Sequence, residues 1–262
     1  LKSKRFLGIY SRDKLTSYDL SFQLNQNVNF FGNPFMDEVL LVENSLPICP
    51  NRVGIFPGSR MPELENNIVI LIKVVLCLPV ERISGDTLSL DMALVSSLDN
   101  ATLGSLASSL GWRLKISSDD SFPDQLIFEN YKINIYRDSF LKVIQSSDIV
   151  LAMAGTASEQ AVGLAKPVVQ IIGKGPQFTS EFADAQRRLL GPTVFCVNPI
   201  FEPQNKFKNT ANLILDTLKR LKTDNQFEKE CYKQAENRLG NNKGATKRIV
   251  HDILNKMNIN LN

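Results

Sequence analysis

Short apolar runs alternate with helix-length segments over most of this chain. Apolar runs bounded by turn residues predict strands, and the amphipathic segments between them predict helices. The predicted strands lie near residues 5–10, 28–32, 52–56, 90–95, 126–135, 148–153, 167–172 and 193–197. Helices are predicted near 12–23, 61–79, 99–110, 138–146, 156–165 and 178–190. Strands joined by helices of crossover length predict an α/β fold with a parallel sheet and right-handed connections.

The strand pattern stops after Val197, and three helices are predicted beyond it, near 206–222, 225–239 and 244–257. The stretch 41–51 contains two prolines and is typical of a linker. Only two strands are predicted ahead of it, too few for a domain. We therefore divide the chain into four parts: 1–40, the C-terminal tail of a domain that is mostly absent; 41–51, a linker; 52–240, the main domain; and 241–262, a C-terminal helix.

Composition and charge exclude several classes of protein. The 262 residues are 43% hydrophobic, enough for a full core, and the net charge of +3 gives no indication of nucleic-acid binding. The C-terminal stretch 205–262 is more basic, with twelve Lys and Arg against six acids. Two interpretations of that stretch stay open: the solvated faces of helices, and a cationic surface that meets an anionic membrane.

Four cysteines lie far apart in the sequence, without a CxxC pair or a neighbouring histidine. This spacing favours neither a zinc site nor a disulfide framework, and it is compatible with a reducing compartment. The longest apolar run, 68–80, is too short to cross a bilayer, and the first residues become polar too early for a signal peptide. We expect a cytoplasmic protein, with peripheral attachment to the inner membrane as an open alternative.

The first candidate loop is GIFPGSRMPEL, residues 54–64. Gly58 allows close backbone approach, and Ser59 could cap a helix or donate a hydrogen bond to an oxygen. Arg60 offers a planar guanidinium that suits phosphate, and Glu63 could hold it in place. An ordinary capped helix beside a solvated arginine is the structural alternative. In open parallel sheets, ligands bind at such strand-to-helix loops.

The second candidate loop opens the helix in DIVLAMAGTASEQAVGLAKPVVQ, residues 148–170. Gly155 and Thr156 would present free backbone N–H groups to a diphosphate. Glu159 or Gln160 then lies about one turn into the helix, where either side chain could accept hydrogen bonds from a ribose diol. The alternative interpretation is that Gly155 and the surrounding alanines only permit close strand–helix packing.

A third loop, within IIGKGPQFTSEFADAQRRLLGP at 171–192, follows a strand and contains Gly and Pro. Lys174 could face phosphate, while Gln177 and Thr179 are polar groups at the start of the next helix. A Gly-Pro turn with a Thr or Ser cap explains the same residues equally well.

Several common motifs are missing. The chain has no GxGxxG, no GxxxxGK[ST] and no DxD pair, which weighs against a dinucleotide oxidoreductase, a P-loop protein and a metal–diphosphate site of the DxD kind. The single histidine, His251, is expected on the surface of the last helix, so histidine-based catalysis has little support.

Taken together, FFGNPFMDEV (30–39), IFPGSRMPEL (55–64) and SDIVLAMAGTASEQAVGLAKPVV (147–169) resemble the lipid-A-disaccharide synthases. These are glycosyltransferases of the GT-B fold that use a UDP-activated acylated glucosamine. Two features make this resemblance specific: the PGSR loop, and the Gly-Thr-Ala turn with Pro twelve residues after the Gly. The similarity covers most of 28–200 and is closest to the divergent synthase-related branch, for which GKGPQFT is typical.

The resemblance implies a GT-B-type α/β fold with a Rossmann-like C-terminal domain that binds the UDP-sugar. Gly58, Ser59 and Arg60 would line the diphosphate side of the site, and Gly155 and Thr156 would donate backbone N–H groups to phosphate. The family's ribose carboxylate stands five residues after the Gly, where this chain has Gln160, with Glu159 one position earlier. The family also often has His where this chain has Asn33.

The function implied is that of a metal-independent hexosyltransferase of lipid A biosynthesis, without a cofactor. Its partners would be a UDP-sugar, a lipid-linked sugar acceptor and a membrane surface, and not nucleic acid. The family's catalytic base belongs to the N-terminal domain, so no catalytic residue is assigned in this chain. Two alternatives stay open: a non-catalytic nucleotide-sugar-binding or scaffold protein, and a UDP-sugar 2-epimerase.

Overall fold

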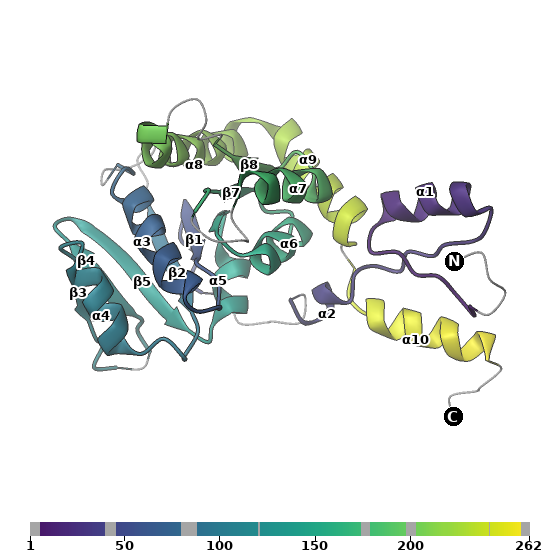
Figure 1. Cartoon of the computed structure of the whole chain (residues 1–262), viewed down its shortest axis with the longest axis horizontal. Helices are drawn as coiled ribbons and strands as arrows, with labels where there is room; N and C mark the ends of the chain where they lie inside the picture. The colour runs from purple at the N-terminus through teal and green to yellow at the C-terminus, as the bar shows by residue number, and fades with distance from the viewer. Residues whose placement is uncertain are drawn as a thin grey trace.

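The computed structural model describes residues 6–39, 46–79, 88–119, 121–173, 179–197, 203–240 and 242–257. The predicted α/β class is confirmed: eight strands form one mixed, mostly parallel sheet with helices on both faces (Figure 1). The strands are β1 (Arg52–Phe56), β2 (Ser89–Leu94), β3 (Arg113–Lys115), β4 (Asp124–Phe128), β5 (Tyr131–Arg137), β6 (Ile149–Ala152), β7 (Val168–Gln170) and β8 (Val194–Cys196).

The α-helices are α1 (Lys14–Leu24), α2 (Phe35–Val39), α3 (Glu63–Val75), α4 (Asn100–Ser108), α5 (Phe140–Ser146), α6 (Gly155–Gly163), α7 (Ser180–Leu190), α8 (Lys206–Thr223), α9 (Asn225–Gln234) and α10 (Ala245–Lys256). A 3₁₀ turn at Pro203–Asn205 precedes α8, and a π-helical turn at Ala235–Leu239 continues α9. The sequence pattern did not predict the short elements α2 and β3, which are five and three residues long.

The strand predicted over 126–135 was wrong in one respect, because two antiparallel strands occupy this region. Phe128 pairs with Tyr131, which leaves Glu129 and Asn130 as a two-residue turn. Glu129 has a φ of 49°, the left-handed conformation that such tight hairpin turns use. An apolar run gives no sign of a reversal when the turn lacks Gly and Pro, so one long strand was the natural interpretation.

The strands predicted near 5–10 and 28–32 were also wrong. Within the described residues, this region contributes a single parallel bridge, between Tyr10 and Asn29. Backbone hydrogen bonds from Ser11 to Asn29 and from Asn29 to Ile9 accompany it. One bridge is not enough to define a strand, although the two segments do run side by side.

The strand order β3-β4-β5-β2-β1-β6-β7-β8 puts β1 and β6 next to each other at the centre of the sheet. The chain leaves β1 toward β2 on one side and returns later to β6 on the other side. The loops that follow two such neighbouring strands lead away in opposite directions. A crevice therefore opens between these loops, beyond the carboxyl ends of the two strands. The fold therefore predicts a ligand site above β1 and β6.

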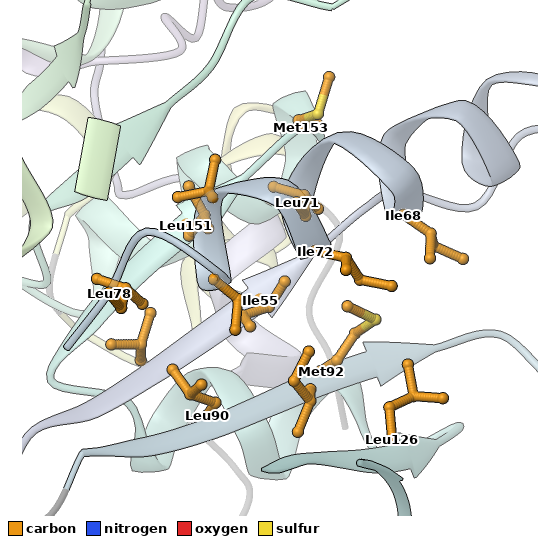
Figure 2. Close-up of a cluster of buried hydrophobic side chains, with 14 of the residues drawn as sticks. Ile55, Ile68, Leu71, Ile72, Leu78, Leu90, Met92, Leu126, Leu151 and Met153 are labelled. Atoms are coloured by element: carbon orange, nitrogen blue, oxygen red, sulfur yellow. The ribbon is translucent and has the colours of Figure 1, made fainter. Parts of the chain in front are cut away.

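Alternate residues of the central strands supply two cores, one on each face of the sheet. Val53 and Ile55 pack with the apolar side of α3, while Phe56 joins the core on the other face. Figure 2 shows the first core, where Ile68, Leu71 and Ile72 of α3 lie over strand residues that include Ile55 and Met92. These side chains are buried, and their removal from water is the main stabilisation of the sheet.

The segment that contains α2 and the last helix, α10, are joined by a cap at the start of α10. The carboxylate of Asp37 accepts hydrogen bonds from the backbone N–H groups of Gly244, Ala245 and Thr246, at 2.8–2.9 Å. Farther along, Arg248 donates to the carbonyl of Phe31 at 2.7 Å. Figure 1 shows α10 beside α2, away from the sheet.

We expect Asp37→Asn to loosen α10. The amide keeps one acceptor oxygen but loses the charge that favours a helix N-terminus, and loss of a cap costs about 0.5–2 kcal/mol. Amide exchange in α10, followed by mass spectrometry at pH 7, should be about 2- to 30-fold faster in the variant. Exchange in α4, whose cap is Asp99, is the internal control. Equal exchange of α10 in both proteins would contradict the prediction.

The same carboxylate makes the attachment of α10 dependent on pH. Burial raises the pKa of Asp37, but the hydrogen bonds from Thr246, Ala245 and Gly244 outweigh it, so the pKa lies below its ordinary value of 3.8. A lowered pKa stabilises the folded state fully above about pH 4, and this contribution is lost as the pH falls through the folded-state value. Asp37→Asn should show less of this acid sensitivity.

Candidate functional site

A cavity of about 820 Å³ lies above the carboxyl ends of β1 and β6. Residues from several parts of the chain line it: the loop after β1, α2, α3, the end of β2, the start of α5, the start of α6 and α7. Eight of the residues singled out in the sequence are among them, namely Gly58, Ser59, Arg60, Glu63, Gly155, Thr156, Glu159 and Gln160. The two candidate loops therefore face one space.

The loop after β1 runs from Pro57 to Met61 and leads into α3. Gly58 has a φ of +98°, a conformation that side chains with a Cβ rarely adopt. Ser59 does not cap α3, because Pro62 occupies the cap position and makes no side-chain hydrogen bond there. In the described part of the chain, no ion pair links Arg60 to Glu63, and both residues line the cavity.

The loop after β6 ends at Ala154, and α6 begins at Gly155 without a side-chain cap. The backbone N–H groups at the start of this helix therefore carry the partial positive charge of the helix end. A methyl group at Gly155 would lie only 3.1 Å from Nε2 of Gln186. Glycine at this position keeps the helix N-terminus open to the cavity.

Asn67 of α3 holds the two loops together. Its side chain is almost fully buried, and its Nδ2 donates to the carbonyl of Pro57 at 2.8 Å and to that of Met153 at 3.5 Å. The sequence analysis missed Asn67. Its one visible signal is position, since a polar residue stands on the otherwise apolar face of α3 that includes Leu64, Ile68 and Leu71.

Glu159 and Gln160 both line the cavity but have different partners. The Glu159 carboxylate forms an ion pair with Arg12 at 2.9 Å, and both side chains retain access to solvent. Gln160 is buried, donates to the carbonyl of Phe35 at 3.4 Å, and has an Oε1 without a hydrogen-bond partner. The Glu159 side chain therefore offers a carboxylate that a bound molecule could reach, whereas the amide of Gln160 is buried.

The third loop contributes less to the described site. Lys174 and Gln177 lie outside the described residues. Thr179 is the N-cap of α7, where its hydroxyl oxygen accepts from the N–H of Phe182 at 3.2 Å, and it is not among the residues that line the cavity. From α7, it is Phe182 and Gln186 that line the cavity, and the sequence analysis named neither.

No other reactive cluster appears in the described residues. Burial raises the pKa of Cys196 to about 11 and that of Cys231 to about 12, so neither thiol forms a nucleophilic thiolate near neutral pH. His251 is exposed on α10 and lies 3.1 Å from Asn255. Within the described ranges, no group of three His, Cys, Asp or Glu side chains is placed to hold a metal ion. None of the described helices is long and apolar enough to span a membrane.

Comparison with known proteins identifies the fold but no family. No protein-family model matches the chain, and no curated protein matches its sequence. A provisionally assigned UDP-N-acetylglucosamine 2-epimerase from Listeria monocytogenes matches 95% of this chain and 59% of its own, with a TM-score of 0.56 at 15% identity. The UDP-GlcNAc 2-epimerase from Neisseria meningitidis, bound to UDP-GlcNAc, matches 95% of this chain and 61% of its own, with a TM-score of 0.52 at 16% identity.

The S. aureus protein MnaA, in a structure with UDP, matches 96% of this chain and 60% of its own, with a TM-score of 0.50 at 15% identity. The chain thus spans about three fifths of the length of these neighbours. It shares a GT-B-like fold with them, which confirms the predicted fold class. At this identity the likeness concerns the fold, and the resemblance to the lipid-A-disaccharide synthases stays a prediction.

Proposed function

We propose that this chain is the donor-binding part of a glycosyltransferase. It would hold a UDP-sugar in the cavity above β1 and β6. The observation that carries the proposal is the convergence of two loops on one space: the Gly58–Arg60 loop and the uncapped N-terminus of α6. Oriented N–H groups and a guanidinium together favour a diphosphate. Two of the structural neighbours, the N. meningitidis epimerase and MnaA, were solved with UDP-GlcNAc and UDP.

In this proposal the residues that line the cavity have the following roles. Gly155 and Thr156 donate backbone N–H groups to the diphosphate, and Arg60 neutralises it, with Gly58 and Ser59 lining the same side. Glu159 accepts hydrogen bonds from the ribose, which requires its ion pair with Arg12 to open or to be shared. Glu63 lines the wall next to Arg60. For Lys174 and Gln177 the role expected from the third loop stays a prediction, while Thr179 caps α7 and is given no contact with the UDP-sugar.

The reaction proposed is transfer of a hexose to a lipid-linked sugar, as the sequence resemblance implies. An acceptor hydroxyl attacks the anomeric carbon, the bond from that carbon to the diphosphate oxygen breaks, and UDP leaves. Negative charge grows on the diphosphate during this step, so Arg60 and the N-terminus of α6 stabilise the transition state electrostatically. We assign no catalytic base in this chain.

A UDP-sugar 2-epimerase is the second candidate, and the fold shared with the L. monocytogenes and N. meningitidis proteins favours it. The two reactions differ in what happens to the sugar. Incubation with UDP-GlcNAc, followed by proton NMR of the sugar ring, would show inversion at C2 for an epimerase without any acceptor. A transferase would leave C2 unchanged and need an acceptor, and a scaffold would bind without turnover.

The proposed donor site predicts that UDP binds to this chain and that Arg60→Ala weakens the binding. We expect the affinity, measured by calorimetry, to fall about tenfold or more, because a hydrogen bond between charged groups is lost. Arg113→Ala, which removes an exposed arginine of β3, should leave the affinity unchanged. Failure of the wild-type chain to bind UDP, or equal binding by Arg60→Ala, would contradict the donor-site proposal.

A further inference from the structure

A buried side-chain amide points at the N-terminus of α6 from the neighbouring helix. Gln186 of α7 is only 6% exposed, lines the cavity, and has its Nε2 close to Gly155. In the part of the chain that the structure describes, the hydrogen bond of the Gln186 side chain is made by Oε1, and Nε2 donates none. An amide donor without a protein partner, carried by a side chain on the wall of a cavity, is placed to donate to an acceptor of a bound molecule.

The orientation of the Gln186 amide follows from a chain of hydrogen bonds beneath the cavity. The hydroxyl of Ser158 donates to the carbonyl of Ala154 at 3.0 Å, so its oxygen is left to accept. Nε2 of Gln170 donates to that oxygen at 3.0 Å, which fixes the amide of Gln170. The same Nε2 donates to Oε1 of Gln186 at 2.8 Å.

Because the oxygen of Gln186 is held by Gln170, its amide nitrogen must face Gly155. Gln170 is fully buried, its Nε2 donates to Ser158 and Gln186, and its own Oε1 has no hydrogen-bond partner. A buried carbonyl without a partner is unfavourable. This arrangement is better explained by the direction it imposes on Gln186 than by a contribution to stability.

We propose that Gln186 donates a hydrogen bond to an anionic oxygen of the bound molecule, and that Gln170 is the residue that positions it. The amide adds a third kind of donor to those of the proposed site, beside the backbone N–H groups of α6 and the guanidinium of Arg60. These donors favour an acceptor such as a phosphate at the start of α6, while the carboxylates of Glu63 and Glu159 line the same cavity. The identity of that phosphate as part of UDP rests on the proposed function.

The test compares three probes, UDP, uridine and inorganic pyrophosphate, by calorimetry with the whole chain. Gln186→Glu retains an oxygen for Gln170 but replaces the donor by a negative charge. We expect this variant to bind UDP and pyrophosphate about tenfold or more weakly, because a hydrogen bond to a charged group is lost. Its affinity for uridine should be unchanged. Gln226→Glu, which adds the same charge at an exposed position of α9, should change none of the three.

Two methionine variants separate binding from folding. Gln186→Met removes the donor without adding charge, and Gln170→Met removes the group that orients it while leaving the cavity wall intact. Both variants should bind pyrophosphate and UDP several-fold more weakly. Their melting temperatures, measured alongside, identify any loss of folding. Equal affinity of wild type and Gln186→Glu for UDP and pyrophosphate would overturn the proposal.

The outcomes also distinguish this proposal from the proposed function. One outcome is that the wild-type chain binds pyrophosphate but not UDP, and that Gln186→Glu no longer binds pyrophosphate. The anion contact of Gln186 then stands and the proposal of a UDP site fails. If UDP binds equally to wild type and Gln186→Glu, the donor site stands and the role of Gln186 fails. If neither probe binds to wild type, both proposals fail.

Discussion

Replacing Asp91 with alanine is expected to lower the free energy of unfolding by about 3–5 kcal/mol, because it leaves a buried arginine without its counter-ion. Asp91 of β2 is fully buried and forms an ion pair with Arg52 of β1, whose side chain is 5% exposed. Nδ2 of Asn134 also donates to the Asp91 carboxylate, at 2.7 Å. After the substitution, the guanidinium keeps the backbone carbonyl of Pro47 and the side chain of Tyr136 as partners, and neither carries a negative charge near neutral pH.

Urea unfolding at pH 7 measures this effect. Asp184→Ala is the matched control, because Asp184 pairs with Arg187 and Arg188 on the exposed side of α7, where ion pairs contribute at most about 1 kcal/mol. A double variant, Asp91→Leu with Arg52→Met, should recover much of the lost stability, since it removes both buried charges. If Asp91→Ala lowers the free energy of unfolding by less than about 1 kcal/mol, water must solvate the guanidinium of Arg52 in place of Asp91.

Gly155→Val is expected to have the largest effect on ligand binding. A Cβ at this position would lie 3.1 Å from Nε2 of Gln186 and 3.6 Å from Cζ of Phe182, and valine adds two methyl groups to it. The side chain would cover the N-terminus of α6 and displace Gln186. We expect the affinity for UDP to fall roughly 100-fold, equivalent to the loss of about two hydrogen bonds to a charged group.

Calorimetry with UDP tests this prediction, and a thermal melt separates it from misfolding, because overpacking costs about 1–3 kcal/mol even where, as at Gly155, the site is only partly buried. Gly104→Val in α4 is the control. The nearest atom to a Cβ there, in Leu114, is 3.9 Å away, and the site does not border the cavity. UDP affinity within about twofold of wild type in Gly155→Val would mean that the N-terminus of α6 does not contact the ligand.

The sequence predicted the parallel part of the fold well because periodicity is a local property. Buried parallel strands such as β1 and β6 are continuous apolar runs, and the helices after them have clear starts. The hairpin of β4 and β5 was missed because its turn, Glu129-Asn130, contains no Gly. The two strands predicted near 5–10 and 28–32 were wrong, since in residues 6–39 the segments near Tyr10 and Asn29 form one isolated bridge.

For the candidate site, the sequence identified residues on the two loops and in the first turns of the helices that follow them, and it missed Asn67 farther along α3 and Gln186 of α7. Gly58 and Gly155 are visible because they stand where a strand leads into a helix: Gly58 has a positive φ, and Gly155 leaves room beside Gln186. Asn67 and Gln186 are not, since a buried amide inside a helix pattern resembles any polar residue of that helix. The partner of Glu159, Arg12, lies in a distant segment that no local pattern connects to α6.

What the sequence alone determined was the α/β class, the alternation of strands and helices, and the two loops at which parallel strands end. These depend on side-chain periodicity and on backbone freedom, which act between residues close in the chain. Only the tertiary structure decided that β1 and β6 are neighbours, that their loops share one cavity, and that Gln170 turns the amide of Gln186 toward Gly155. Those facts depend on strand order and on the direction of hydrogen bonds between distant residues, because packing in three dimensions sets both.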